Sequence, residues 1–188
     1  MDYRRNWQPG GTFFFAVVAY HRHRLFADPA AFDLLQTVLH EAKTERPLRM
    51  EARVVLPDHL HMMWALPPGD GDFSWRWAKI KSQFTRRWLA AGATEARVTP
   101  GQGRKQARGI WQPRFFEHTI RDQDDFVAHV EYIHYNPVKH GYVEYLKDWA
   151  RSSFRAFVRR GLQPLNWCCG VGKEDSRPRI GLLYDGFE

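Results

Sequence analysis

The chain has 188 residues, a length that fits a single domain. Hydrophobic residues make up 44% and charged residues 26% of the chain, which is ordinary globular usage and excludes a globally disordered protein. The formal net charge is +7, and between residues 73 and 116 there are ten basic residues and a single acid, Glu95. This uneven charge indicates a polyanionic partner, with nucleic acid as the leading candidate.

The longest apolar run covers residues 13–20 and is far shorter than the roughly 20 residues that span a bilayer. Because no small-residue cleavage pattern follows that run, we expect neither a signal peptide nor a membrane segment. The two cysteines, Cys168 and Cys169, are adjacent and match neither a disulfide framework nor a CxxC metal pair. These features predict a protein of the reducing cytoplasm.

The first half of the chain predicts a strand, a helix and two further strands. Residues 12–20 are rich in aromatic and β-branched side chains and predict a buried strand. Asp28-Pro29 is a typical helix start, and apolar residues at helical spacing continue from there until Pro47. Residues 49–56 and 59–66 predict two strands joined by a turn.

The second half predicts two amphipathic helices. The first is marked by an apolar stripe: Phe73, Trp77, Ile80, Phe84 and Trp88. A loop over 90–108 and a short extended segment over 109–118 follow, and the second helix covers about 122–136 and ends at Pro137. We therefore predict an α+β domain over residues 1–165, with a mostly antiparallel sheet carrying helices, and a C-terminal tail over 166–188.

His59 and His61 are the first candidate functional pair. Alternate side chains of a strand point to the same face, so the two imidazoles are arranged to share one divalent ion. A hydrogen-bonded, partly buried histidine pair is the simpler interpretation of an isolated His-x-His. The apolar sequence on both sides favours a function, because buried polar groups are costly.

The predicted helix over 122–136 supplies a second candidate group. Its helical period places Phe126, Val127, Val130 and Ile133 toward the core. Tyr132 and Asn136 lie four residues apart, on a stripe beside that core face that also carries His129, whereas Tyr135 is expected to meet solvent. This spacing favours Tyr132 over Tyr135 as the residue held at an internal site.

Four segments, taken in order and spacing, resemble the REP-associated tyrosine transposases, which are single-tyrosine members of the HUH endonuclease superfamily. The segments are YRRNWQPGGTFFF, PDHLHMMW, WQPRFFEH and EYIHYNPVKHGYV. The resemblance covers about residues 1–165 and implies a ferredoxin-like sandwich with the His-x-His pair on a central strand. It also implies that His59 and His61 bind a metal ion, that Tyr132 is the nucleophile, and that Asn136 is a third metal ligand.

The resemblance implies Mg²⁺ or Mn²⁺, although imidazole ligands alone would also suit Zn²⁺. It further implies cleavage of single-stranded or hairpin DNA through a 5′-phosphotyrosine, followed by strand joining, and leaves open whether the protein is a monomer or a dimer. We expect DNA contacts from basic residues of the basic block and of the segments with the resemblance: Arg4, Arg5, Arg76, Lys79, Arg86, Arg87, Arg114 and Lys139.

Two other functions remain open on the sequence. A DNA- or RNA-binding module without catalytic activity would use the basic surface alone. A metal-dependent nuclease would use the same histidines with an activated water, and it would keep its activity after Tyr132→Phe. Asp58, beside the histidines, is a further candidate ligand or base.

Overall fold

The computed structural model describes residues 8–97 and 108–167. Within these ranges no helix combines the length and the apolar character needed to cross a membrane. Several predictions lie outside the described residues: those for Arg4 and Arg5, for most of the loop over 90–108, and for the tail from Cys168 onward.

Four antiparallel strands form one sheet, β1 (Thr12–Val18), β2 (Arg49–Val55), β3 (His59–Ala65) and β4 (Phe116–Thr119). Their spatial order is β2-β3-β1-β4, so β3 and β1 are the two central strands. Two helices connect β1 to β2 and β3 to β4, which produces the ferredoxin-like topology. The predicted α+β class and the central position of His59 and His61 are confirmed.

Helices α1 (Pro29–Glu45) and α2 (Phe73–Ala90) begin where the sequence predicts. The Asp28 side chain accepts a hydrogen bond from the Ala30 backbone N–H at 2.8 Å, and the Asp72 side chain accepts one from Trp75 at 3.0 Å. Such caps satisfy backbone donors that a helix leaves without partners at its first turn. The apolar stripe of α2 is buried except for Trp88, which is half-buried and stacks on Phe84.

Helix α4 (Gln123–Lys139) runs three residues further than predicted, because it continues through Pro137. A proline inside a helix removes one backbone donor, which is why the sequence predicted an end there. In the structure the helix ends only at His140, whose backbone N–H donates to the Asn136 carbonyl at 3.0 Å. The extension keeps Lys139 on the helix and places His140 at its C-cap.

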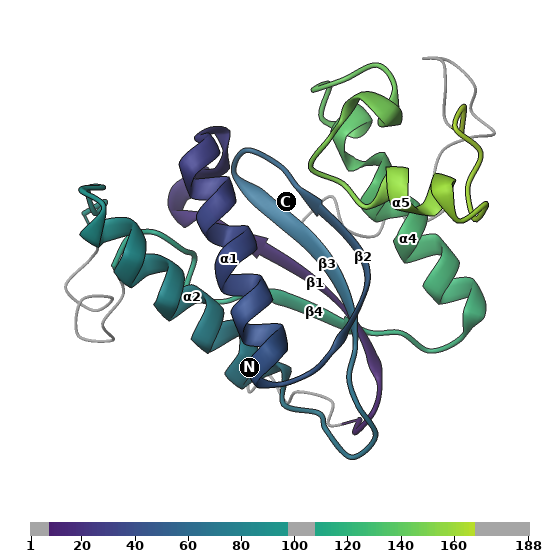
Figure 1. Ribbon diagram of the computed structural model, residues 1–188, viewed down its shortest axis with the longest axis horizontal. Coiled ribbons are helices and arrows are strands. Elements are labelled where there is room, and N and C mark those ends of the chain that lie inside the picture. Colours follow the sequence, from purple (N-terminus) through teal and green to yellow (C-terminus); the bar gives the residue numbers. More distant parts are fainter. Residues whose placement is uncertain (1–7, 98–107, 168–188) are drawn as a thin grey trace.

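The sheet separates two apolar clusters. Helices α1 and α2 lie on a different side of the sheet from α4 (Figure 1). Alternation along β3 sends Leu60, Met62 and Trp64 to the face covered by α1 and α2. On the other face α4 packs through Val130 and Ile133. The protein is therefore a sandwich with helices on both faces, and α4 lies across the histidine-bearing face of β3.

The C-terminal elements η3 (Leu146–Asp148) and α5 (Phe154–Arg159) pack against α4 through a small apolar cluster. Two further 3₁₀ turns, η1 (Tyr20–Arg22) and η2 (Leu25–Ala27), follow β1. The small cluster includes Tyr135, which is half-buried rather than solvent-exposed as predicted. Val127, predicted in the core, is 42% exposed. Tyr135 is covered because the C-terminal elements pack on a part of α4 that the helical period alone assigns to solvent.

Candidate active site

His59 and His61 point from β3 toward α4, and each side chain is 1% exposed. Their ring centroids are 5.0 Å apart with an angle of 81° between the ring planes. Leu60 between them faces the α1–α2 side and is fully buried there. The strand thus presents two imidazoles side by side in a site from which water is largely excluded.

Asp58 orients the first imidazole. The Nδ1–H of His59 donates to the Asp58 carboxylate at 2.7 Å, and the other carboxylate oxygen pairs with Arg22 Nε at 2.9 Å. Burial raises the pKa of Asp58, but the hydrogen bond from His59 and the positive charge of Arg22 act in the opposite direction, and the net pKa is lowered. Asp58 therefore stays ionised and directs Nε2 of His59 into the site, as carboxylates behind metal-binding histidines do.

Tyr132 and Asn136 face the histidines from α4. The Tyr132 ring is 5.3 Å from the His61 ring in an edge-on arrangement and is 1% exposed. Asn136, one helical turn later, is fully buried, and its amide nitrogen donates to the Tyr132 carbonyl at 2.9 Å. The structure thus brings Tyr132 to the paired histidines, which lie more than 70 positions earlier in the sequence, and buries Asn136 one turn further along α4.

The donor set fits a divalent ion. His59 Nε2 and Asn136 Oδ1 are buried, and neither has a hydrogen-bond partner among the described residues. Leaving a buried polar atom without a partner is unfavourable by about 1–3 kcal/mol, so such atoms in a native protein call for an explanation. Imidazole nitrogens and an amide oxygen are metal ligands, and an ion between them would satisfy both atoms.

Lys139 lies beside the candidate nucleophile. Its ammonium nitrogen is 5.3 Å from the centre of the Tyr132 ring, within the range of a cation–π contact. Because Lys139 is on the last turn of α4, its position depends on the continuation of the helix past Pro137. A positive charge is therefore held next to the phenol and available to a nearby phosphate.

The basic side of α2 differs from the prediction. Arg76 is fully buried, and its guanidinium binds the Asp70 carboxylate in a bidentate pair at 2.7 and 3.1 Å and also donates to the Pro47 and Asp72 carbonyls. The prediction of a DNA contact at Arg76 is wrong for this structure, because its donors are directed to the protein. Arg76 holds the loop before α2 instead.

Two further cations of α2 pair with acids on α1. Lys79 lies 3.0 Å from a Glu45 oxygen, and Arg87 binds both Glu41 oxygens at 2.7 and 2.8 Å. These pairs hold α1 to α2 on the face of the sheet away from the histidines. The exposed Arg86 side chain donates to Gln83 on its own helix. Part of the positive charge of α2 is therefore used in ion pairs with α1 and is not free to bind a polyanion.

Arg114 is exposed and lines a pocket of about 390 Å³ together with Tyr20, His21, Gln112 and Pro113. His21 and Arg22 both have positive φ angles, 49° and 54°, which non-glycine residues rarely adopt. The same turn directs Arg22 to Asp58, so it connects the pocket to the residue that orients His59.

A second histidine cluster, absent from the sequence-based predictions, joins β4 to α4. His118 Nε2 lies 2.8 Å and His129 Nδ1 3.0 Å from opposite oxygens of Asp125. The ligand atoms of the three side chains lie within 4.8 Å of one another, so the group could hold a metal ion. The i, i+4 spacing of Asp125 and His129 was the available signal, but His118 reaches them only through the tertiary fold.

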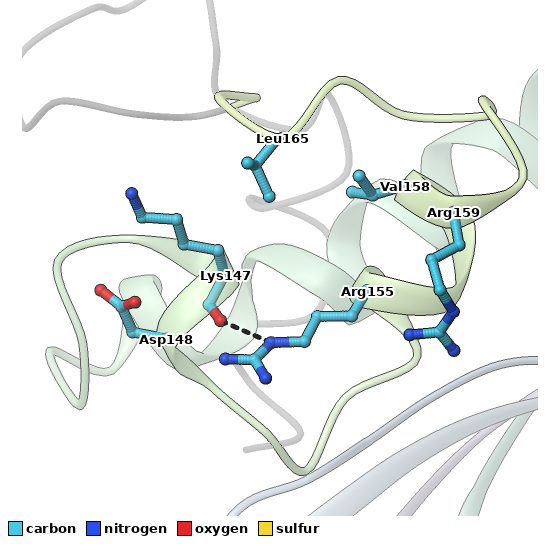
Figure 2. Close-up of a pocket in the computed structure, with 6 residues that line it drawn as sticks. All are labelled: Lys147, Asp148, Arg155, Val158, Arg159 and Leu165. Carbon is cyan, nitrogen blue, oxygen red and sulfur yellow. Dashed lines mark hydrogen bonds between the residues drawn. The ribbon is translucent and has the colours of Figure 1, made fainter.

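A third feature is a pocket of about 340 Å³ beside α5, shown in Figure 2. Cationic side chains from η3 and α5 surround it, and Arg155 Nε donates to the Lys147 carbonyl at 2.8 Å. Its lining residues are Lys147, Asp148, Arg155, Val158, Arg159 and Leu165. None of the histidines, Tyr132 or Asn136 lines it, so it is separate from the candidate active site.

A ferredoxin-like sheet that presents paired histidines to a tyrosine on a covering helix has the arrangement expected of a single-tyrosine HUH enzyme. A comparison with family models finds no match. The chain is 41% identical over 179 residues to the REP-associated tyrosine transposase of Escherichia coli strain K12, covering 95% of this chain and 98% of that protein. It is 37% identical over 167 residues to a candidate REP-associated tyrosine transposase of Haemophilus influenzae, covering 88% and 92%.

A solved structure of a REP-associated tyrosine transposase bound to a REP hairpin is 41% identical, with a TM-score of 0.76 over 96% of this chain and 98% of that one. The chain therefore belongs to the REP-associated tyrosine transposases, and it is a tyrosine transposase. The resemblance seen in the four sequence segments is confirmed.

Proposed function

We propose that the protein cuts and rejoins one strand of DNA beside a hairpin-forming repeat, with Tyr132 as the nucleophile. The contact between the Tyr132 ring and His61, in a buried site that also contains His59 and Asn136, carries this proposal. The relative bound to a REP hairpin supports hairpin DNA as the substrate class. We further propose that the protein acts in the cytoplasm, as expected for a bacterial-type enzyme whose substrate is DNA.

The proposed reaction is a phosphoryl transfer to the tyrosine. The Tyr132 oxygen attacks the scissile phosphorus, the bond from phosphorus to the 3′ oxygen breaks, and the phenolic proton is given up as the leaving strand gains a 3′-OH. The product is a 5′-phosphotyrosine, which a 3′-OH can attack in the reverse sense to join strands. Because the energy of the phosphodiester is kept in the covalent link, joining needs no further energy source.

The protein would use Mg²⁺ or Mn²⁺, held by His59, His61 and Asn136. When bound, the ion neutralises charge on the phosphate and polarises one of its oxygens. Asp58 keeps the Nδ1 proton on His59 and so directs Nε2 toward the ion. Asn136 is held in place by its bond to the Tyr132 carbonyl, which ties the proposed third ligand to the turn that carries the nucleophile.

Lys139 stabilises negative charge next to the phenol. A tyrosine titrates near pH 10 when unperturbed, so its oxygen is a poor nucleophile at neutral pH without help. The ammonium beside the ring favours the phenolate and attracts the phosphate. Because Tyr132 is almost completely buried, we expect a neighbouring segment to move when DNA reaches the oxygen.

The proposed DNA surface combines Lys139 with the exposed Arg114 and Arg86, and with Arg4 and Arg5 outside the described residues. Lys79 and Arg87 contribute only if they leave their partners on α1. Each phosphate contact releases condensed counterions, so the affinity for DNA should fall steeply with salt. An affinity for DNA that does not change between about 50 and about 200 mM salt would contradict the proposed DNA surface.

The test is a covalent adduct on a denaturing gel after incubation with a labelled single-stranded hairpin and Mn²⁺. Tyr132→Phe should abolish the adduct. Tyr135→Phe, which alters a tyrosine three residues away on another side of α4, should retain it. Cleavage without an adduct in Tyr132→Phe would support a water-using nuclease instead. Binding without cleavage in the wild-type protein would support a non-catalytic nucleic-acid-binding module.

A further inference from the structure

Tyr132 and Asn136 lie one turn apart on α4, and His140 follows four residues later as the C-cap of the helix. The Tyr132 ring is 5.3 Å from His61, and the His140 ring is 5.1 Å from His59. Asn136, between them on the helix, is fully buried. Since residues four apart lie on one side of a helix, the row continues past the two residues proposed above and ends on an imidazole.

The distances suit imidazoles that share one ion. The His59 and His61 rings are 5.0 Å apart at 81°, and the His59 and His140 rings are 5.1 Å apart at 71°. With metal–nitrogen bonds of about 2.1 Å, two neighbouring imidazoles on one ion have ring centres roughly 4.5–5.2 Å apart. Both pairs lie within that range, so the His140 ring is about as close to the His59 ring as the His61 ring is.

The spacing of the four residues is also typical of ligand pairs. His59 and His61 occupy positions i and i+2 of a strand, which share a face. Asn136 and His140 occupy positions i and i+4 of a helix, the spacing by which a single helix presents two ligands to one ion. The helix end supports the pair, since the His140 backbone N–H donates to the Asn136 carbonyl at 3.0 Å.

We infer that His140 is a fourth protein ligand of the divalent ion, so that a strand pair and a helix pair bind it from opposite sides. This inference rests on the proposed function, because the same ion is involved. Three imidazoles and one amide oxygen make a nitrogen-rich site. Mg²⁺ prefers oxygen ligands, whereas imidazole favours later divalent ions, so the site should bind Co²⁺ and Mn²⁺ more tightly than Mg²⁺.

The experiment measures Mn²⁺ binding to the full chain by titration calorimetry and by the EPR signal of free Mn²⁺. His140→Ala should weaken Mn²⁺ binding by roughly 10–100-fold. Removing a residue that only orients a metal ligand already has an effect of this size, so removing a ligand should have at least the same effect. His40→Ala, which changes an exposed histidine on α1, is the matched control and should change the affinity by less than about twofold. A His140→Ala affinity within that same margin would overturn the inference.

His59→Ala separates this inference from the proposed function. If His59→Ala keeps Mn²⁺ affinity, the proposed metal site fails; if His59→Ala loses it and His140→Ala keeps it, only the role of His140 fails. Paramagnetic broadening of the imidazole NMR signals is measured on the wild-type protein, so it does not depend on whether a variant folds. Sub-stoichiometric Mn²⁺ should broaden the signals of His59, His61 and His140 first, and broadening that begins at His118 and His129 would overturn the assignment.

Discussion

Two histidine clusters meet the same helix and are built from similar residues, yet they differ in where the carboxylate lies. In the β3–α4 site, Asp58 contacts Nδ1 of His59 from behind, on the side of Arg22. In the β4–α4 cluster, Asp125 lies between His118 and His129 and binds both. Phe14 of β1 lies between the two clusters, with its ring 5.4 Å from His61 and 4.9 Å from His129.

The position of the carboxylate decides what each cluster can do. The Asp125 carboxylate accepts hydrogen bonds from His118 and from both the backbone and the side chain of Arg121. His129 Nδ1 lies 3.0 Å from its other oxygen and donates to the Asp125 backbone carbonyl at 2.7 Å. Burial raises the pKa of Asp125, but the bonds from His118 and Arg121 outweigh it and lower the pKa to about 2. Its charge is therefore matched by protein donors, and we interpret this cluster as a link that holds β4 to the start of α4.

In the β3–α4 site the carboxylate leaves Nε2 of His59 turned toward the proposed metal site. His59 uses Nδ1 on Asp58 and keeps Nε2 for the site, where Asn136 Oδ1 is also buried without a hydrogen-bond partner among the described residues. A carboxylate behind an imidazole thus orients a ligand, whereas one between two imidazoles satisfies them. The comparison suggests that the position of the carboxylate separates a histidine pair that could bind an ion from one that holds two elements together.

The largest expected effect separates the two clusters by activity. His59→Ala or His61→Ala should lower the rate of covalent adduct formation by at least about a hundredfold, since an ion contributes several kcal/mol to stabilising transition-state charge. His118→Ala should lower it by less than about tenfold, because it removes a link at the other end of α4. Rates are compared on one labelled hairpin, and equal losses in both clusters would remove the distinction.

The next effect concerns stability. Asp125→Asn should lower the free energy of unfolding by about 2–3 kcal/mol, because it weakens several hydrogen bonds to a buried carboxylate. Urea unfolding followed by circular dichroism measures this change. Asp124→Asn, one position earlier in the same first turn of α4 and exposed, is the matched control and should stay within about 0.5 kcal/mol. An Asp125→Asn protein as stable as this control would refute the structural link.

Asp58→Asn tests the opposite role of a carboxylate. The change removes the acceptor that orients the His59 ring, so the Mn²⁺ affinity should fall roughly tenfold, at the lower end of such effects. Calorimetric titration with Mn²⁺ provides the measurement. Asp125→Asn should leave the affinity unchanged in the same titration, and a larger loss there than in Asp58→Asn would mean that the ion binds at the β4–α4 cluster.

The smallest effect is a pH dependence of stability. The pKa of Asp125 is lowered from an ordinary value of 3.8 to about 2 in the folded protein. The ionised form is therefore the one that stabilises the fold, and its contribution is complete above about pH 4 and is lost as the pH falls toward 2. Unfolding free energies of the wild-type protein and of Asp125→Asn should converge over that interval, and parallel pH curves would contradict the proposed cause.

Local periodicity was sufficient to predict most helices and strands, and to predict that the paired histidines and Tyr132 point inward. Two-residue alternation placed His59 and His61 on one face of β3, and the helical period directed Tyr132 inward. The same periodicity failed at Val127, which is exposed, and at Tyr135, which η3 and α5 cover. It also treated Pro137 as a helix end, although the helix passes through it.

The sequence by itself determined the sandwich class, the paired imidazoles and the tyrosine, because these follow from the spacing of residues within single elements. Only the tertiary structure decided that Arg76 is buried, that Lys79 and Arg87 pair with α1, and that Asp125 joins two histidines. The physical reason is that charges and imidazoles choose partners by distance in space. Those partners come from segments that meet only when the sheet and its helices have packed.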